Sequence, residues 1–142
     1  MRPALIDNSA WARLRGGVAV PGHRRAEVAQ AIEVGEVWVC LPFLLEAGYS
    51  ARGAREHDEL LGELDVLPRA EMDALVERRA LDAQAQLARV GHHRLPPVDL
   101  LIAALAERHA LGILHYDADY DVIATRTDLE FESVWLAERG SL

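Results

Sequence analysis

Four acidic side chains are the residues best suited to chemistry, because each of them interrupts an apolar segment. They are Asp7, Glu46, Asp99 and Asp117. Most of the remaining members of a set of 23 acidic residues fall on faces where water is expected. Taking an unpaired carboxylate out of water costs several kcal/mol. Each of the four therefore needs a proton, a basic partner or a cation.

Asp99 shows this conflict most clearly. It precedes the segment LLIAALA, Leu100–Ala106, which is apolar all round and predicts a buried helix. Pro96-Pro97 favours a helix start just before it, so Asp99 is expected in the first turn. One interpretation is a carboxylate stabilised by the helix dipole, an effect of about 0.3–1 kcal/mol. That effect is too small to offset burial, whereas a bound cation would offset it.

The other three acids each allow an ordinary structural interpretation as well. Asp7 follows the apolar run Ala4–Ile6, and Asp117 follows Ile113–Tyr116. An aspartate at the end of a strand is often the cap of the next helix. Glu46 lies within the apolar segment FLLEAGYSA, where an arginine could pair with it. Taken singly, these positions favour a structural role about as much as a metal site.

The hydrophobic pattern predicts short strands alternating with helices. We expect strands at 4–6, 37–40, 113–116 and 131–136. Asn8 or Ser9 is expected to cap a first helix. Further helices are expected over 23–34, 42–51, 54–65, 71–90 and 96–109, with a short last helix from Ala118. This alternation predicts an α/β fold with a short, mainly parallel sheet flanked by helices. Sites in such folds lie beyond the carboxyl ends of the strands, where Asp7 and Asp117 are expected to meet.

A cluster of four carboxylates points to a particular class of chemistry. Such acids repel one another and stay together only if protons or cations neutralise them. Clustered carboxylate oxygens suit hard cations such as magnesium or manganese. Magnesium keeps several of its waters and often works with substrate phosphates, which indicates phosphoryl-transfer chemistry.

The bulk composition predicts one soluble cytoplasmic domain. The chain has 142 residues, and its single cysteine, Cys40, excludes an internal disulfide, which suits a reducing compartment. The longest uncharged apolar stretch, Val37–Leu45, is much shorter than the ~20 residues of a membrane span. The apolar run near the N-terminus is too short for a signal peptide. The net charge of −8 argues against nucleic acid, but binding depends on where the charges lie rather than on their sum.

Several other kinds of site are excluded by the residues that the chain lacks. All 15 basic residues are arginine, so the chain lacks the lysine used by phospho-aspartate receivers, haloacid-type phosphatases and P-loop proteins. There is no Cys-x-x-Cys or His-x-x-x-His pair to hold zinc. His115 is expected to be a core or strand-end histidine. Arg13, Arg15 and Arg94 lie near the acidic motifs and could hold phosphates or simply meet solvent, and Trp11 could stack on a base.

Four segments resemble the four acidic motifs of a known family. LIDNSAW, LLEAGYSA, GHHRLPPVDLLIAALAERHAL and LHYDADYDVIA resemble, in order, the motifs of PIN domains in the form found in VapC toxins. The resemblance covers nearly the whole chain and implies a single PIN domain over residues 1–142 with a three-layer PIN-like fold. Asn8 stands where threonine is common in the family, a difference that concerns only local capping.

The resemblance also implies an activity and a set of site residues. PIN-domain toxins are endoribonucleases that hydrolyse RNA phosphodiesters with Mg²⁺, for which Mn²⁺ can substitute, and so inhibit translation. Asp7, Glu46, Asp99 and Asp117 match the acids of the site, with Asp7 and Asp99 as the expected direct ligands. Ser9 and Asp119 match auxiliary positions. Attack by water would leave a 5′-phosphate and a 3′-hydroxyl, and transfer RNA is the leading candidate substrate, ahead of ribosomal and messenger RNA.

Partners are implied in the same way. VapC-type toxins are held inactive by a VapB-type antitoxin, and a homodimer or a toxin–antitoxin hetero-oligomer is expected. An arginine or lysine of the antitoxin is expected to enter the acidic pocket. The alternative is a non-catalytic PIN scaffold that binds RNA or regulates another process, and metal-dependent cleavage of RNA would distinguish the two.

Overall fold

The computed structural model describes all residues, 1–142, and contains a parallel sheet between two layers of helices. The strands are β1 (Ala4–Ile6), β2 (Val37–Trp38), β3 (Gly112–His115) and β4 (Ser133–Trp135). Their order in the sheet is β2-β1-β3-β4, and every neighbouring pair is parallel. The prediction of an α/β fold with a short parallel sheet is confirmed.

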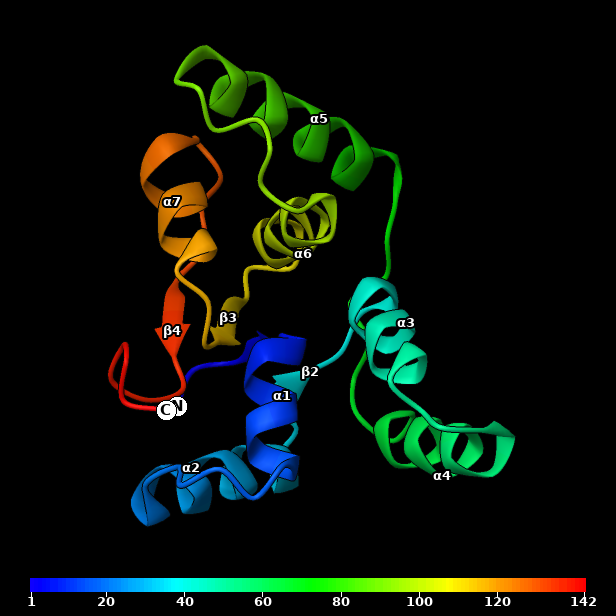
Figure 1. Cartoon of the computed structure of the whole chain (residues 1–142). Coiled ribbons are helices and arrows are strands. Elements are labelled where there is room, and N and C mark those ends of the chain that lie inside the picture. Colours follow the sequence, from blue (N-terminus) through cyan, green and yellow to red (C-terminus); the bar gives the residue numbers. More distant parts are fainter.

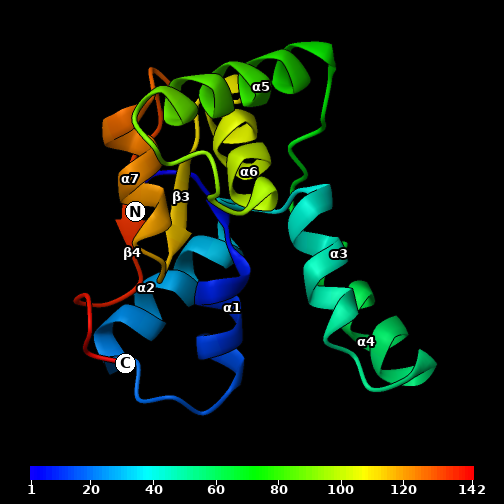
Figure 2. The same ribbon diagram turned by 45° about the horizontal axis from the view of Figure 1, so that its top comes forward.

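Helices cover both faces of this sheet. They are α1 (Asn8–Arg15), α2 (Gly22–Glu33), α3 (Leu41–Tyr49), α4 (Ala54–Leu64), α5 (Ala74–Arg89), α6 (Pro97–Arg108) and α7 (Asp119–Arg126). In Figure 1, α5, α6 and α7 lie above the strands, and α1 and α2 lie below them. Helices α3 and α4 pack against each other and project to one side in both Figure 1 and Figure 2.

The two central strands are buried because helices cover them on both sides. All residues of β1 and β3 are buried, and Leu5 pairs with Ile113 of β3 and with Trp38 of β2. The backbone amide of Asp7 still donates to the carbonyl of Leu114 at 2.9 Å. The end of β1 is therefore fixed against β3 at the edge where the acids were expected.

Helix α6 is buried, as its apolar sequence predicts. Seven of the eight residues from Asp99 to Ala106 are buried within it, the exception being Leu101. It packs between the sheet and α5, which crosses over it in Figure 2. The helix ends where Ala110 takes a positive φ of 54° and the amide of Leu111 returns to the carbonyl of Ala106, a Schellman-type ending that is usually made by glycine. Asp99 thus belongs to the most enclosed helix of the molecule.

Several element boundaries differ from those expected. The last strand covers only Ser133–Trp135, and β2 ends at Trp38, after which Val39 makes an isolated bridge to Arg69. Helix α5 begins at Ala74, because the carboxylate of Asp73 accepts a hydrogen bond from the amide of Val76 and caps the helix. Met72 therefore lies before the helix and is exposed rather than on its apolar face.

Two further features of the chain bear on the expectations from sequence. Cys40 is buried in the core, where a thiol without a second cysteine packs as a small apolar side chain. No helix combines the length and the apolar character needed to cross a membrane.

Candidate active site

The sheet topology brings the ends of β1 and β3 together, and α3 and α6 add acids from the flanks. Asp7 directly follows β1, and Asp117 follows β3 after one intervening residue. Glu46 lies on α3, and Asp99 lies in the first turn of α6. Four elements distant in sequence thus supply the four acids that the sequence singles out.

Three aspartates form the tightest group of carboxylates. Asp99, Asp117 and Asp119 each offer an oxygen atom, and these three atoms lie within 4.8 Å of one another. Asp99 is only 7% exposed, and its Oδ2 is buried with no hydrogen-bond partner in the protein. A buried carboxylate oxygen without a donor is rare in folded proteins. The group is therefore incomplete without a proton or a cation.

Asp7 stands beside this group but is already hydrogen-bonded through both oxygens. Its Oδ2 accepts hydrogen bonds from the amide of Ser9 at 2.9 Å and from the Ser9 hydroxyl at 2.6 Å. It is therefore the cap of α1, a role that the sequence suggested for Asn8 or Ser9. The cap interpretation of Asp7 is confirmed. Its Oδ1 atom is linked to Asp99 through the hydroxyl of Tyr120, and its role as a site residue stays a prediction.

Tyr120 joins Asp7 to Asp99, although no pattern in the sequence singled it out. Its hydroxyl lies 2.7 Å from Asp7 Oδ1 and 3.3 Å from Asp99 Oδ1. The side chain is fully buried, and a single O–H proton lies between the two carboxylates. The one available signal was a tyrosine among the aspartates of DADYD, because a tyrosine hydroxyl needs a hydrogen-bond acceptor if it is buried.

Glu46 lies at the rim of the cluster. It forms no ion pair with an arginine, which removes that alternative explanation for its apolar surroundings. Burial raises the pKa of its carboxyl, and the nearby Asp7 carboxylate raises this pKa further. It also lines a cavity of about 600 Å³ together with Asn8, Leu45 and Val98. Glu46 therefore connects the acidic cluster to an apolar groove.

Ser9 connects the first strand to the third. Its hydroxyl donates to Asp7 and accepts a hydrogen bond from the backbone amide of Tyr116 at 2.9 Å. The hydroxyl therefore fixes Asp7 relative to the segment that leads to Asp117. This contact gives a physical reason for a small hydroxyl residue at the auxiliary position predicted from the sequence.

A chain of partly buried hydrogen bonds supports Asp117. The amide of Asp117 donates to Nδ1 of His115 at 3.0 Å. The other ring nitrogen, Nε2, lies 2.7 Å from the hydroxyl of Ser133, which in turn donates to Asp121 at 2.6 Å. The donors and acceptors are all satisfied if His115 is neutral and protonated on Nε2, and burial lowers the pKa of this imidazole.

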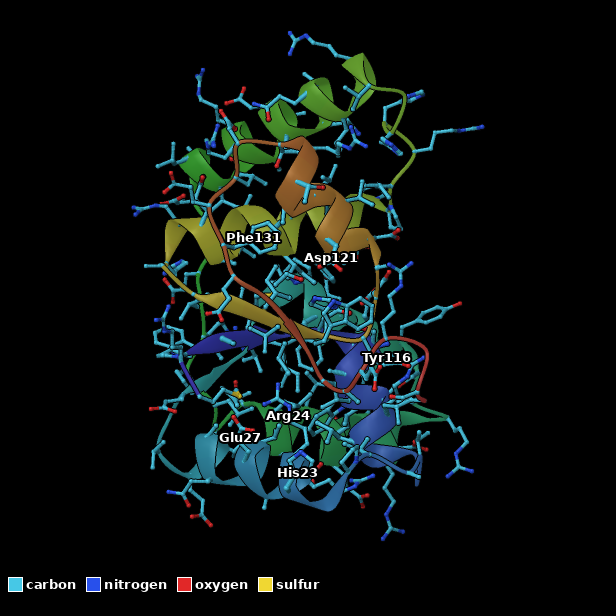
Figure 3. All side chains as sticks on the ribbon, turned by 90° about the vertical axis from the view of Figure 1, so that its left-hand side faces the viewer. His23, Arg24, Glu27, Tyr116, Asp121 and Phe131 are labelled. Atoms are coloured by element: carbon cyan, nitrogen blue, oxygen red, sulfur yellow. The ribbon has the colours of Figure 1, made fainter.

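Asp121 thus differs from the other two aspartates of its segment. Figure 3 shows it on α7, at the end of the helix near the strands. Its second oxygen accepts a hydrogen bond from the indole of Trp135 at 3.0 Å. Asp117 and Asp119 face the cluster, whereas Asp121 anchors the network behind it. His115 is therefore the buried strand-end histidine that the sequence predicted.

The electrostatics of the cluster favour a bound cation. Burial raises the pKa of the Asp99 carboxyl to about 7, with further contributions from the charges of Asp7, Asp117 and Asp119, while the hydrogen bond from Tyr120 opposes the rise. Burial and the Asp117 carboxylate also raise the pKa of Asp119. These residues offer only oxygen atoms as metal ligands, and Oδ2 of Asp99 has no hydrogen-bond partner. They therefore fit a hard divalent ion.

Metal binding is expected to depend on pH because the ion must displace a proton. The raised pKa of Asp99, about 7, means that the metal-free folded state favours the protonated acid. The raised pKa of Asp99 therefore stabilises the metal-free folded protein most at pH values below the pKa of this carboxyl in the unfolded chain. The stabilisation is lost as the pH rises through about 7. The Kd for Mn²⁺ should accordingly fall about tenfold from pH 5.5 to 6.5 and level off above about 7.5. Calorimetric titrations at these three pH values measure it, and a Kd that does not change with pH would contradict this assignment.

Comparison with known families gives one matching model. The model described as PIN domain matches residues 4–125. Among curated relatives, Ribonuclease VapC18 of Mycobacterium tuberculosis is 37% identical over 140 residues, covering 96% of this chain and 97% of the relative. Ribonuclease VapC51 of the same organism is 38% identical over 138 residues, covering 97% of this chain and 96% of the relative.

Solved structures with the same fold agree with this result. A DNA-bound VapBC complex from Salmonella typhimurium contains a chain that matches with a TM-score of 0.73 and 18% identity, covering 96% of this chain and all of that one. VapC20 of Mycobacterium tuberculosis, described as a toxin that cleaves the sarcin–ricin loop, matches with a TM-score of 0.62 and 19% identity, covering 89% of this chain and 98% of that one. At these identities the likeness concerns the fold.

Proposed function

Because this chain belongs to the PIN-domain family, in its VapC branch, we propose that it is a metal-dependent endoribonuclease and the toxin of a toxin–antitoxin pair. The observation that supports the proposal most strongly is the buried, unpartnered Oδ2 of Asp99 within a group of three aspartates. The curated relatives named above are ribonucleases by name, and all four acids that match the family motifs are present in this chain.

The proposed ion is Mg²⁺, with Mn²⁺ able to replace it. Asp99, Asp117 and Asp119 are the side chains that would hold it, with Asp7 and Glu46 at the border of the site. When bound, such an ion lowers the pKa of a bound water and stabilises the negative charge that develops on the phosphate. The sequence favoured Asp7 as a direct ligand. Because its oxygens accept three hydrogen bonds, we propose Asp119 as the more available ligand.

The protein residues have separate roles in this proposal. Asp7, held by Ser9 and Tyr120, keeps the negative charge of the pocket fixed relative to α6. Glu46 is partly exposed and its pKa is raised, so its carboxylate is suited to accept the proton of an attacking water. His115 holds the amide of Asp117 and stays neutral. Hydrolysis by water would leave a 5′-phosphate and a 3′-hydroxyl.

The proposed substrate is a structured RNA, with transfer RNA as the leading candidate, and its cleavage would inhibit translation. Proteins read RNA sequence mainly at unpaired loops whose bases are accessible. Incubating total RNA with the purified protein and Mg²⁺, followed by mapping of 5′-phosphate ends, tests the activity. We expect discrete cleavage sites that disappear with a chelator. Intact RNA under all metal conditions would favour a non-catalytic PIN scaffold instead.

An apolar groove beside Glu46 is the proposed docking site for a VapB-type antitoxin. It is lined by Asn8, Leu41, Pro42, Leu45, Glu46, Tyr49, Ser50, Met72, Val98 and Leu101. Several of its apolar side chains are exposed, with Tyr49 at 93% and Leu45 at 65%, and contiguous exposed apolar surface is typical of interaction sites. The acids at one end favour a partner segment that joins an apolar face to an arginine or lysine. Solved structures that contain a chain with this fold include VapBC toxin–antitoxin complexes. A homodimer stays a prediction.

Tyr49 is expected to be the main anchor of this interface, because exposed aromatic residues dominate binding energies. Tyr49→Ala should weaken binding of the product of the neighbouring antitoxin gene by at least about thirtyfold, or about 2 kcal/mol. Val66→Ala removes another exposed apolar side chain, 82% exposed and outside the groove, and should change the Kd less than twofold. Equal Kd values for the two variants, measured by calorimetry, would place the antitoxin elsewhere.

A further inference from the structure

Arg13 is a cation near the acidic site that no carboxylate of the protein neutralises. It lies on α1, and it forms no ion pair with any carboxylate, although the chain has 23 acidic residues. By contrast, Arg24 is paired with Glu27, and Arg79 with Glu107. A guanidinium has five N–H donors, and within the protein only Nη1 of Arg13 donates, to the carbonyl of Ser9 at 2.9 Å.

The guanidinium is nevertheless held in one place. Its central carbon lies 4.3 Å from the centre of the Tyr116 ring, in a cation–π contact. The ring is fixed in turn: the backbone amide of Tyr116 donates to Ser9, and its hydroxyl accepts a hydrogen bond from the amide of Leu142 at 2.8 Å. Trp135 packs edge-on against it at 5.5 Å. Figure 3 shows Tyr116 beside the C-terminal segment.

The same contacts tie Arg13 to the acidic cluster. Ser9 is shared: its carbonyl accepts from Arg13, and its hydroxyl binds Asp7 and the amide of Tyr116. Ser9 therefore holds Arg13 through its backbone carbonyl and Asp7 through its hydroxyl. Tyr116, whose ring lies under the guanidinium, directly precedes Asp117.

This arrangement meets a need that the acids create. A strand of RNA repeats its negative charge at every nucleotide, and a site lined by carboxylates repels the phosphates on either side of the one that is cut. A planar guanidinium with free donors matches two phosphate oxygens. We propose that Arg13, oriented by Tyr116, binds the RNA phosphate next to the scissile one. The inference rests on the proposed function and adds a substrate contact to it.

Arg15 is a weaker candidate for the same role. It lies on α1 as well, but its guanidinium is 5.5 Å from the ring of Trp11 and 3.8 Å from the carboxylate of Glu63. Its charge is shared with an acid, and no hydrogen bond links it to Ser9 or Asp7. The two arginines of α1 are thus expected to differ in their effect on RNA binding.

The test compares Arg13→Gln with Arg2→Gln in a cleavage-silent Asp99→Asn background. Arg2 precedes β1 at the opposite edge of the parallel sheet and is 88% exposed in its side chain, so Arg2→Gln removes the same charge away from the site. Binding of a fluorescein-labelled, mixed-sequence single-stranded RNA 20-mer is followed by anisotropy in Mg²⁺ at several salt concentrations. Arg13→Gln should weaken binding about tenfold and reduce the slope of log Kd against log salt by about 0.7, the value for one phosphate contact on a single strand.

Arg2→Gln should leave both quantities nearly unchanged, and Arg13→Lys should recover part of the affinity, because lysine keeps the charge but not the planar donors. If Arg13→Gln and Arg2→Gln bind alike, the phosphate contact is wrong while the nuclease proposal stands. If the protein with all its arginines neither binds this RNA nor cleaves total RNA, the proposed function fails first. Equal melting temperatures of the variants show that the fold is unchanged.

Discussion

Asp99→Asn is expected to reduce RNA cleavage by at least about 1,000-fold, which corresponds to about 4 kcal/mol of activation free energy. The substitution keeps the shape of the side chain but replaces the one oxygen of the cluster, Oδ2, that has no partner in the protein. An amide nitrogen at this position would donate to the neighbouring carboxylates and would not bind a cation. The effect should appear in kcat rather than in the binding of RNA, because the ion acts on the reacting phosphate.

The matched control for this experiment is Asp58→Asn. Asp58 lies on α4, is 87% exposed in its side chain, and carries the same charge. Its substitution should leave the cleavage rate within about twofold. Cleavage by Asp99→Asn at the rate of the unmodified protein would exclude Asp99 from the site and would leave its buried oxygen unexplained.

The second large effect concerns the stability that a divalent ion should provide. An ion that binds only the folded state stabilises it by RT ln(1 + [L]/Kd), about 2.7 kcal/mol at a hundredfold excess over Kd. For a domain of this size such a change raises the melting temperature by several degrees. Mn²⁺ should therefore raise the melting temperature of the unmodified protein, and Asp99→Asn should lose most of that rise. An equal rise in both proteins would place the ion elsewhere.

In a chelator the order of the two proteins should reverse. At a pH above the Asp99 pKa of about 7, removing the charge of Asp99 relieves repulsion from Asp7, Asp117 and Asp119, so Asp99→Asn should melt several degrees above the unmodified protein. Asp7→Asn should behave differently, because Asp7 accepts hydrogen bonds from Ser9 through one oxygen and from Tyr120 through the other. Asparagine keeps one oxygen that can still cap α1, but it loses the other acceptor. We therefore expect Asp7→Asn to melt lower than Asp99→Asn in a chelator, and this contrast separates the relief of charge repulsion from the loss of an acceptor.

The parts of the site that could be predicted from the sequence are those set by local pattern. The apolar segment after Asp99 predicts both the burial of α6 and the conflict with its acid. The short strands before Asp7 and Asp117 predict that these residues reach one edge of a parallel sheet, because the strand period and the chain direction are local properties. Resemblance to a family added Ser9 and Asp119, which single positions in the sequence would not indicate.

The remaining parts depend on contacts between distant elements, which no local pattern specifies. Tyr120 bridges Asp7 and Asp99 only because α7 packs against α6. The chain of hydrogen bonds from His115 through Ser133 to Asp121 forms only if β4 pairs with β3 in the observed register. Likewise, hydrophobic periodicity placed Met72 in α5, whereas the cap at Asp73 excludes it from the helix. These features depend on side-chain rotamers and on strand register, which are set only when distant elements pack together.

Anomalous diffraction from crystals grown with Mn²⁺ is the most direct measurement of the central claim, that this acidic cluster is a metal site. We predict a single strong peak, or a close pair, between the carboxylates of Asp99, Asp117 and Asp119, with Asp99 Oδ2 as a ligand. The peak should be absent in crystals of Asp99→Asn. A peak only at other acidic residues, or none at saturating Mn²⁺ near pH 7.5, would show that this cluster is not a metal site.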